Sequence, residues 1–550
     1  MTTRPSLAAL LALAVLLASA CAEAPVTRPA QPLGPGPRPA PVAKAPAQPW
    51  WKTAVFYEVF VRSFQDSDGD GIGDFRGLTA KLDYLNDGDP TTTADLGVDA
   101  LWLMPMLESP SYHGYDVTDY DHVEKDYGTE ADFDAFVRAA HARGIHVIVD
   151  LVLNHASAKH PWFLDAAASR TSRHRDWFVW SDRDLGWGQP WNEKADTWHE
   201  AGGSWFYGLF WEGMPDLNWR NAEVRAEARR FAHAWLARGV DGFRLDAIRY
   251  LVEDGPGPGQ SSTPETFTYL FEFAKAVREA KPDAYLVGEV WAGFDEAALY
   301  YGKAGEGLSA MFDFPLAGSV VSAATAGDPS SFTKAAEETL RVLPQGATDA
   351  PFLTNHDMRR IGSLAEGDPA KLKLAASVLL TLPGTPFLYY GEEIGMENGP
   401  GGADEQKRTP MRWDATPLAG FTTGKPWFAF SPARPDANVA AQANDPGSLL
   451  SRYRALLRAR RASPALSGGN LTLLPRVPGV RAVAFLRRAV GETVLVVHNL
   501  GATPVDLPSL AAPGASAEPV FVDAGASLVR EEGGWRARLA PRSTAAWRVR

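Results

Sequence analysis

The sequence of 550 residues lacks features on which several protein classes depend. It contains one cysteine, Cys21, so no disulfide can form within the chain. Lysine and arginine total 54 against 66 aspartate and glutamate residues, which gives a formal charge of −12. No cluster of basic residues with interleaved aromatic residues occurs, and we therefore expect no nucleic acid among the partners.

Long apolar runs are also scarce. The run from Leu7 to Ala20 follows Arg4 and is too short to span a bilayer as a mature helix, so residues 1–20 are typical of a signal peptide. Cys21 ends the stretch LASAC, which resembles the lipid-modified cysteine of a bacterial lipoprotein, although Ala18 stands where leucine is usual. We expect export and a lipid anchor to a bacterial membrane, the outer membrane in a Gram-negative cell. Secretion or release to the periplasm after ordinary cleavage is the alternative.

The segment after the cysteine has a composition that cannot bury a core. Residues 22–49 contain nine prolines among mostly alanine, glutamine and glycine, which favours extended polyproline conformation. At about 3.1 Å per residue, such a segment reaches up to roughly 85 Å. We therefore predict a tether over 21–49 and a folded region from Trp50 onward.

From Trp50 onward, short apolar runs alternate with amphipathic helical stretches such as Ala131–Arg143, Ala222–Arg238 and Glu265–Ala280, a pattern typical of a parallel sheet. Eight such runs predict an α/β fold, a (β/α)₈ TIM barrel. The predicted strands are Val55–Val61, Ala100–Leu103, His146–Val152, Gly242–Leu245, Tyr285–Glu289, Ala310–Phe312, Phe352–Thr354 and Phe387–Tyr390.

The spacing of these strands predicts two further domains. The largest gap follows the third strand, so residues 155–217 are expected to form a small inserted domain, with the barrel over 50–154 and 218–465. After the last helix, around Leu449–Arg461, short β runs such as Val480–Leu486 and Thr493–Asn499 alternate with turn residues. They predict a C-terminal antiparallel β-sandwich over 466–550.

Three carboxylates follow predicted strands: Asp246 in GFRLDAIRY, Glu289 in YLVGEVW and Asp357 in FLTNHD. Barrel enzymes place their chemistry at the carboxyl ends of the strands. Two nearby acids, one protonated and one ionised, suffice to cleave a glycosidic bond, so the sequence predicts a glycoside hydrolase. Arg244 lies two residues before Asp246, on the same face of the strand, where its charge would keep Asp246 ionised.

Five motifs together carry a family resemblance. DLVLNH (Asp150–His155), MPDLN (Met214–Asn218) and the three acidic motifs occur in the order typical of glycoside hydrolase family 13, the α-amylase family, which the chain resembles from Trp50 to Arg550. The resemblance implies a retaining mechanism with Asp246 as nucleophile, Glu289 as general acid and base, and Asp357 as the residue that stabilises the transition state. It also implies that the sugar is bound by two histidines and one stacking aromatic residue: His155, His356 and Tyr115.

The segment DSDGDGIGD carries four carboxylates, each separated from the next by an even number of positions. Hard oxygen ligands at this spacing can surround Ca²⁺, so calcium is the expected cofactor, with five ligating residues: Asp66, Asp68, Asp70, Asp74 and the carbonyl of Ile72. The segment resembles the calcium loop after the first barrel strand in the oligo-1,6-glucosidase branch of the family. The histidine that serves another calcium site of α-amylases is Tyr250 here, so we do not predict that second site.

Substrate preference stays open between related activities. RTPMRWD, GFTTGKPW, NVAAQ and Asp116 after Tyr115 resemble α-glucosidases, in which such an acid helps to close a pocket. MPDLN, FDFPL and Ala247 instead resemble the intermediary group of bacterial α-amylases, near the oligo-1,6-glucosidase and neopullulanase branch. We predict a monomer that hydrolyses α-1,4 bonds in starch-type glucans and maltooligosaccharides. The alternatives are an exo-acting α-glucosidase or oligo-1,6-glucosidase and a transglycosylase such as a trehalose synthase, whereas a non-catalytic scaffold of this family would lack some of the three acids.

Overall fold

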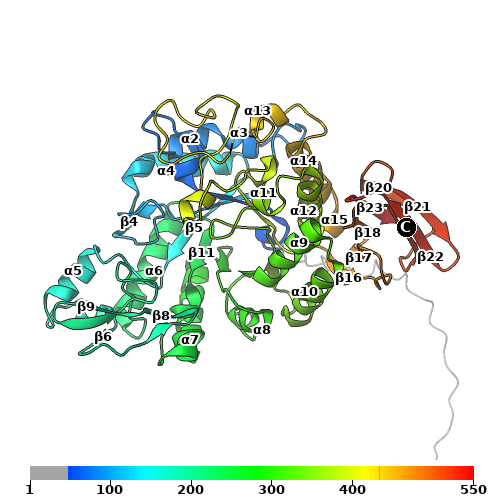
Figure 1. Ribbon diagram of the computed structural model, residues 1–550. Helices are drawn as coiled ribbons and strands as arrows, with labels where there is room; N and C mark the ends of the chain where they lie inside the picture. The colour runs from blue at the N-terminus through cyan, green and yellow to red at the C-terminus, as the bar shows by residue number, and fades with distance from the viewer. Residues whose placement is uncertain (1–47, 433) are drawn as a thin grey trace, which may run out of the picture. The chain divides into compact units, whose positions relative to one another are not determined.

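A computed structural model describes residues 48–432 and 434–550 (Figure 1). The predicted signal peptide, the predicted lipid modification of Cys21 and the predicted tether up to residue 47 lie outside the described residues. Within the described part, no helix combines the length and the apolar character that crossing a bilayer requires.

Eight parallel strands form a barrel, hydrogen-bonded in the order β14-β13-β12-β11-β5-β2-β1-β15. The ring closes between its two ends, where the N–H of Phe387 donates to the carbonyl of Pro351 at 2.9 Å. The strands are β1 (Phe56–Val59), β2 (Ala100–Leu103), β5 (His146–Val152), β11 (Gly242–Asp246), β12 (Tyr285–Gly288), β13 (Ala310–Phe312), β14 (Thr348–Ala350) and β15 (Phe387–Tyr389).

The seventh strand differs from the prediction. We expected it at Phe352–Thr354, but β14 covers Thr348–Ala350, and Phe352 forms only an isolated bridge to Phe387. Pro351 explains the difference, because proline has no N–H to donate to a neighbouring strand and therefore ends the regular pairing before Phe352.

Helices follow the strands and pack around the barrel (Figure 1). Side-chain caps define where several of them begin; Thr129 and Asp132 form a reciprocal capping box at the start of α4. The principal helices are α2 (Phe75–Ala80), α4 (Glu130–Ala142), α6 (Ala222–Ala237), α7 (Pro264–Ala280), α9 (Phe314–Ala326), α10 (Pro329–Val342), α12 (Pro369–Thr381) and α14 (Leu449–Ala462), with short helices α1 (Val61–Phe64), α3 (Leu82–Leu85), α8 (Phe294–Ala297), α11 (Ile361–Leu364), α13 (Val439–Gln442) and α15 (Pro464–Gly468).

Aromatic side chains fill the interior of the barrel. Phe56 stacks on Phe387 with ring centres 4.4 Å apart and on Tyr285 at 4.9 Å, and Trp102 and Phe312 pack into the same buried cluster. Because these side chains pack the barrel interior, we expect a ligand to bind at the ends of the strands.

An inserted region lies between β5 and α6, as predicted. It contains α5 (Pro161–Ala168) and two small antiparallel sheets, β6-β10-β9 and β7-β8. Their strands are β6 (Trp180–Ser181), β7 (Gly188–Gln189), β8 (Asn192–Asp196), β9 (Trp198–Ala201) and β10 (Ser204–Tyr207). A bridge between His155 and Asp216 joins the two ends of the insertion and keeps His155 beside the barrel mouth.

Two antiparallel sheets form the C-terminal part, in the orders β16-β17-β18-β23-β20 and β19-β22-β21. Side chains from both sheets share one buried cluster, which confirms the predicted sandwich. The strands are β16 (Asn470–Leu473), β17 (Ala482–Ala489), β18 (Glu492–Asn499), β19 (Val505–Leu510), β20 (Ala517–Val522), β21 (Ser527–Glu531), β22 (Gly534–Leu539) and β23 (Thr544–Val549). Since Pro49–Arg550 forms one compact unit, the predicted domain boundaries stay predictions.

Candidate active site

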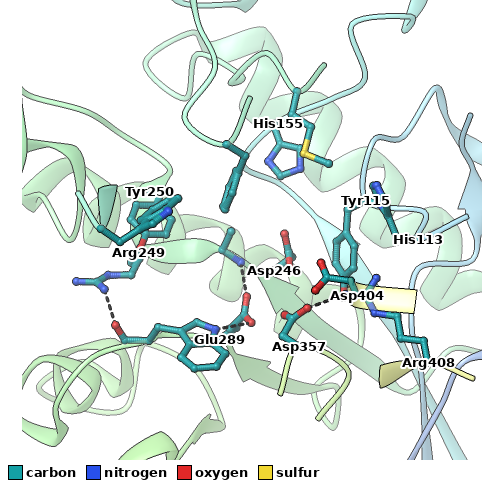
Figure 2. A pocket seen from close by; sticks show the side chains of 15 residues that line it. His113, Tyr115, His155, Asp246, Arg249, Tyr250, Glu289, Asp357, Asp404 and Arg408 are labelled. Atoms are coloured by element: carbon teal, nitrogen blue, oxygen red, sulfur yellow. Dashed lines mark hydrogen bonds and ion pairs between the residues drawn. The ribbon is translucent and has the colours of Figure 1, made fainter. Parts of the chain in front are cut away.

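The three predicted catalytic acids meet at the carboxyl ends of the strands. Asp246 is the last residue of β11, and Glu289 directly follows β12, the paired strand in which Gly288 lies opposite Leu245. Asp357 lies in the loop after β14. All three line one cavity of about 520 Å³ (Figure 2).

Arg244 connects the acids. Its side chain is 1% exposed, and its guanidinium lies 2.6 Å from Asp246 Oδ1, 2.9 Å from Glu289 Oε1 and 2.8 Å from Asp150 Oδ1. The predicted contact between Arg244 and Asp246 is therefore present, but the same cation also serves two further buried carboxylates. One guanidinium cannot fully compensate three negative charges, so protonation must contribute.

The surroundings give the three acids different proton affinities. Burial raises the pKa of Glu289, Arg244 opposes the shift, and the charges of Asp246 and Asp357 add to it; together these effects bring the pKa to about 7. Burial also raises the pKa of Asp246, against the effect of Arg244. For Asp357, burial is outweighed by neighbouring cations, including Arg408 at 2.7 Å, and its pKa falls to about 2. Near neutral pH, Glu289 is thus the acid that exchanges a proton and Asp357 is ionised.

His155 has a free hydrogen-bonding atom at the cavity. Its Nε2 is buried and has no hydrogen-bond partner among the described residues, and the ring faces the cavity across from the acids (Figure 2). Burial lowers the pKa of His155 to about 4, so the ring is neutral. A buried polar atom without a partner is costly, which suits a nitrogen that bonds a ligand hydroxyl.

His356 is bound within the protein instead. Its Nδ1 lies 2.6 Å from Glu58 Oε1, and its Nε2 lies 2.6 Å from the hydroxyl of Tyr115. The Tyr115 ring lies nearly parallel to the His356 ring and lines the cavity, whereas His356 does not line it. The structure thus places His356 behind Tyr115, where it fixes the orientation of that ring.

Asp116 lies away from the cavity. Its buried carboxylate accepts hydrogen bonds from Ser109 Oγ at 2.7 Å and from Ser111 Oγ. It is absent from the cavity lining, although Tyr115 beside it is present. The structure therefore brings Tyr115, but not Asp116, to the cavity lined by the three acids.

Several residues of the site were not assigned from the sequence. Arg408 pairs with Asp357, and its motif RTPMRWD had been noted only for substrate preference. Glu58 holds His356, but it lies inside the first predicted strand and not at its end, so the signal used for the other acids does not identify it. Four exposed or partly exposed aromatic residues also line the cavity, and the sequence alone does not distinguish them from core residues: Trp191, Phe210, Tyr250 and Trp291.

Residues 66–74, the acidic loop, lie apart from these acids. Asp66, Asp68 and Asp74 each offer an oxygen atom, and these atoms lie within 4.8 Å of one another. Since calcium–oxygen distances are 2.3–2.6 Å, two ligands of one ion are at most about 5.2 Å apart, so the three oxygens fit one Ca²⁺. Asp70 does not belong to this group; its Oδ1 accepts the N–H of Ile72.

Backbone geometry explains the glycines of the acidic loop. Gly71 has φ of +96°, and a Cβ there would lie 1.8 Å from the carbonyl of Lys425. Thr422, in the same segment as Lys425, donates its hydroxyl hydrogen bond to Asp66. The loop is therefore packed against residues 422–425, in the GFTTGKPW motif.

Comparisons with known proteins agree with this geometry. Residues 58–469 match the family model of the alpha-amylase catalytic domain. The chain is 39% identical over 458 residues to alpha-amylase 3 of Dictyoglomus thermophilum, covering 82% of this chain and 86% of that protein. It is 36% identical to the trehalose synthase of Thermus thermophilus, covering 82% of this chain and 50% of that protein. The crystal structure of an alpha-amylase from H. orenii superposes with a TM-score of 0.81 at 40% identity, covering 91% of this chain and 100% of the other.

Proposed function

The chain belongs to the alpha-amylase family of glycoside hydrolases, and on that premise we propose that it is a retaining hydrolase of α-1,4 bonds in starch-type glucans and maltooligosaccharides. The observation that carries the proposal is the shared contact of Asp246 and Glu289 with Arg244 at the ends of two adjacent strands. This contact supports the proposal that a nucleophile and a proton donor act on one bond, as a retaining mechanism requires.

The residues divide the reaction into two steps. In the first, a carboxylate oxygen of Asp246 bonds to the anomeric carbon while the bond to the leaving oxygen breaks, and Glu289 gives that oxygen its proton. In the second, Glu289 takes a proton from water, the water oxygen bonds to the anomeric carbon, and Asp246 leaves as a carboxylate. Asp357, kept ionised beside Arg408, stabilises the positive charge that develops on the sugar.

Three observations favour an α-amylase over an exo-acting glucosidase. Asp116, the acid expected to close the pocket of an exo-acting enzyme, turns away from the cavity and bonds two serines. The identity to alpha-amylase 3 of Dictyoglomus thermophilum is 39%, against 32% to the oligo-1,6-glucosidase of Halalkalibacterium halodurans. Trp191, Phe210 and Tyr250 form a joined aromatic wall, which provides stacking surface for more than one sugar ring.

The decisive experiment combines one variant with product analysis. Asp246→Asn removes the nucleophile without changing the size of the side chain, and we expect a loss of kcat on the order of 10⁴-fold or more on maltoheptaose. Asp295→Asn, at a side chain that is 80% exposed, is the matched control. Retained activity in Asp246→Asn disproves the assignment; trehalose as the main product from maltose makes the protein a transglycosylase.

We also propose that the acidic loop binds Ca²⁺ through Asp66, Asp68 and Asp74. The ion would supply positive charge that cancels the repulsion among these carboxylates. Because Asp66 also bonds Thr422, the ion would stabilise the packing of the acidic loop against residues 422–425.

We further propose that Cys21 carries a lipid that anchors the enzyme to a membrane, on the basis of the sequence LASAC and the proline-rich segment after it. Two or three acyl chains hold a protein through a salt wash, whereas one binds marginally. Cell fractionation compares the native protein with Cys21→Ser, which should become soluble and remain active. Equal distribution of the two forms would replace the anchor by simple secretion.

A further inference from the structure

Trp291 lies two residues after Glu289 and is held in place from two sides. Its ring stacks on Phe314 with centres 4.0 Å apart, and its backbone carbonyl accepts a hydrogen bond from Arg249 at 2.5 Å. The side chain is 45% exposed, so burial in a core does not explain its position. Its indole Nε1 donates to Glu289 Oε1 at 3.0 Å.

The two oxygens of Glu289 have different surroundings. Oε1 receives the indole N–H of Trp291 and contacts Arg244 Nη2 at 2.9 Å. Oε2 receives only the longer bond from the N–H of Ala247, at 3.2 Å. Since an oxygen that already accepts two donors is a poor place for a proton, the proton of the Glu289 carboxyl belongs on Oε2.

Trp291 differs from the other two donors to Glu289, those of Arg244 and Ala247, because it bonds Glu289 alone and does so through a side chain. Arg244 also binds Asp150 and Asp246, so its removal disturbs three carboxylates at once. The Ala247 donor is backbone, held at φ of +49°, a left-handed conformation unusual for a residue other than glycine. The indole N–H bonds Glu289 alone and can be removed by a side-chain substitution.

We propose that Trp291 is a positioning residue for Glu289: its indole N–H orients the carboxyl by bonding Oε1 and favours the ionised form that must accept a proton in the second step. The inference rests on the proposed role of Glu289 as acid and base. A hydrogen bond to the charged form of a carboxyl lowers its pKa, as this one does for Glu289 against the larger opposing effect of burial.

Other charged and titratable groups that face Glu289 are not removed by a substitution at Trp291. They come from four parts of the barrel mouth: Arg244 and Asp246 on β11, Asp150 on β5, Asp357 after β14, and Arg249 and Tyr250 in the turn Ile248–Tyr250. Since their charges are unchanged, a shift in the titration of Glu289 reports the lost N–H.

The test is the pH dependence of kcat/KM of Trp291→Phe on maltoheptaose. Phenylalanine keeps a flat ring over Phe314 but has no N–H. We expect the alkaline limb, which reports loss of the proton from Glu289, to move up by about 0.5–1 pH unit. Phe314→Leu is the matched control, because it removes the stacked ring but leaves the N–H, an apolar side chain under the indole, and the bond from Arg249 to the Trp291 carbonyl. Its alkaline limb should not move.

Two outcomes overturn the proposal: an unmoved limb in Trp291→Phe, or equal shifts in Trp291→Phe and Phe314→Leu. Trp291→Met, which also lacks the N–H, repeats the measurement if melting shows that the first variant is misfolded.

Glu289→Gln tests the underlying function separately. It should lose far more activity on maltoheptaose than on α-maltosyl fluoride, whose leaving group needs no proton; equal retention on both substrates refutes the role of Glu289 whatever Trp291 does.

Discussion

Replacing Arg244 by methionine should destabilise the protein by an amount that depends strongly on pH. Arg244 is 1% exposed and contacts three buried carboxylates, those of Asp150, Asp246 and Glu289. Removing one partner of a buried ion pair costs about 3–5 kcal/mol, because the remaining charge stays buried without compensation. Methionine fills much of the volume, so the lost charge is the main change.

Protonation limits this cost, and it sets the pH dependence. A carboxyl with an ordinary pKa near 4 takes up a proton at a cost of about 1.4 kcal/mol at pH 5 and about 5.4 kcal/mol at pH 8. Burial already raises the pKa of Asp150, Asp246 and Glu289, and Arg244 opposes each shift. Without Arg244 the folded-state pKa values rise further, so the variant is most stable at low pH and loses stability as pH rises through those values.

Urea unfolding at pH 5 and pH 8 measures the effect. The difference in free energy of unfolding between the native protein and Arg244→Met should be at least about 2 kcal/mol larger at pH 8. Arg341→Met is the matched control: its side chain is 61% exposed and pairs with Asp295, so a change below about 1 kcal/mol is expected. If Arg244→Met costs the same at both pH values, or nothing, the shared-cation account of the site is refuted.

Three further predictions concern other parts of the molecule. EDTA should lower the melting temperature of the native protein and calcium should restore it, and Asp68→Asn should respond less to both. Identical melting curves with EDTA and with calcium, together with no bound metal by elemental analysis, would show that the acidic loop is a solvated turn. Burial raises the pKa of Asp349 from 3.8 to about 7, so the contribution of this residue to the free energy of unfolding is present below pH 4 and is lost as pH rises through 7. Between pH 4 and pH 8, the free energy of unfolding of Asp349→Asn should therefore gain up to about 4 kcal/mol relative to the native protein. A difference in urea unfolding that does not change with pH would contradict this prediction. His155→Phe should lower kcat/KM on maltoheptaose about tenfold without changing the melting temperature, because it removes Nε2, the atom available to bond a ligand hydroxyl. An unchanged kcat/KM would show that His155 does not bind the substrate.

Much of the barrel could be predicted from local sequence, because hydrophobic runs and helix patterns are local properties. The strand His146–Val152 has the predicted bounds, and α6 and α7 begin within one residue of the expected positions. The strand β14 was misplaced because the apolar run after Pro351 looked more strand-like than Thr348–Ala350. A proline inside or beside such a run shifts the pairing in a way that the hydrophobic pattern alone does not reveal.

The direction of a side chain was harder to predict than its place in the chain. Tyr115 and Asp116 are neighbours, and both were expected to bind substrate, but the two side chains have different surroundings. Tyr115 lines the cavity, whereas Asp116 bonds Ser109 and Ser111 on its other side. To predict which of the two side chains lines the cavity, one must know the positions of the two serines, and the spacing of the motif does not give them.

The division of roles among the acids follows from a count of buried charges. Four carboxylates, Asp150, Asp246, Glu289 and Asp357, gather around two guanidinium groups, those of Arg244 and Arg408. Arg408 contacts Asp357 and keeps it ionised, while Arg244 is divided among the other three. Since two cations cannot balance four anions in a buried site, at least one proton must stay. The pKa of Asp150 is raised to about 8 and that of Glu289 to about 7, so both can hold a proton near neutral pH. Of the two, Glu289 lines the cavity and Asp150 does not, and this makes Glu289 the acid that can serve both steps of the reaction.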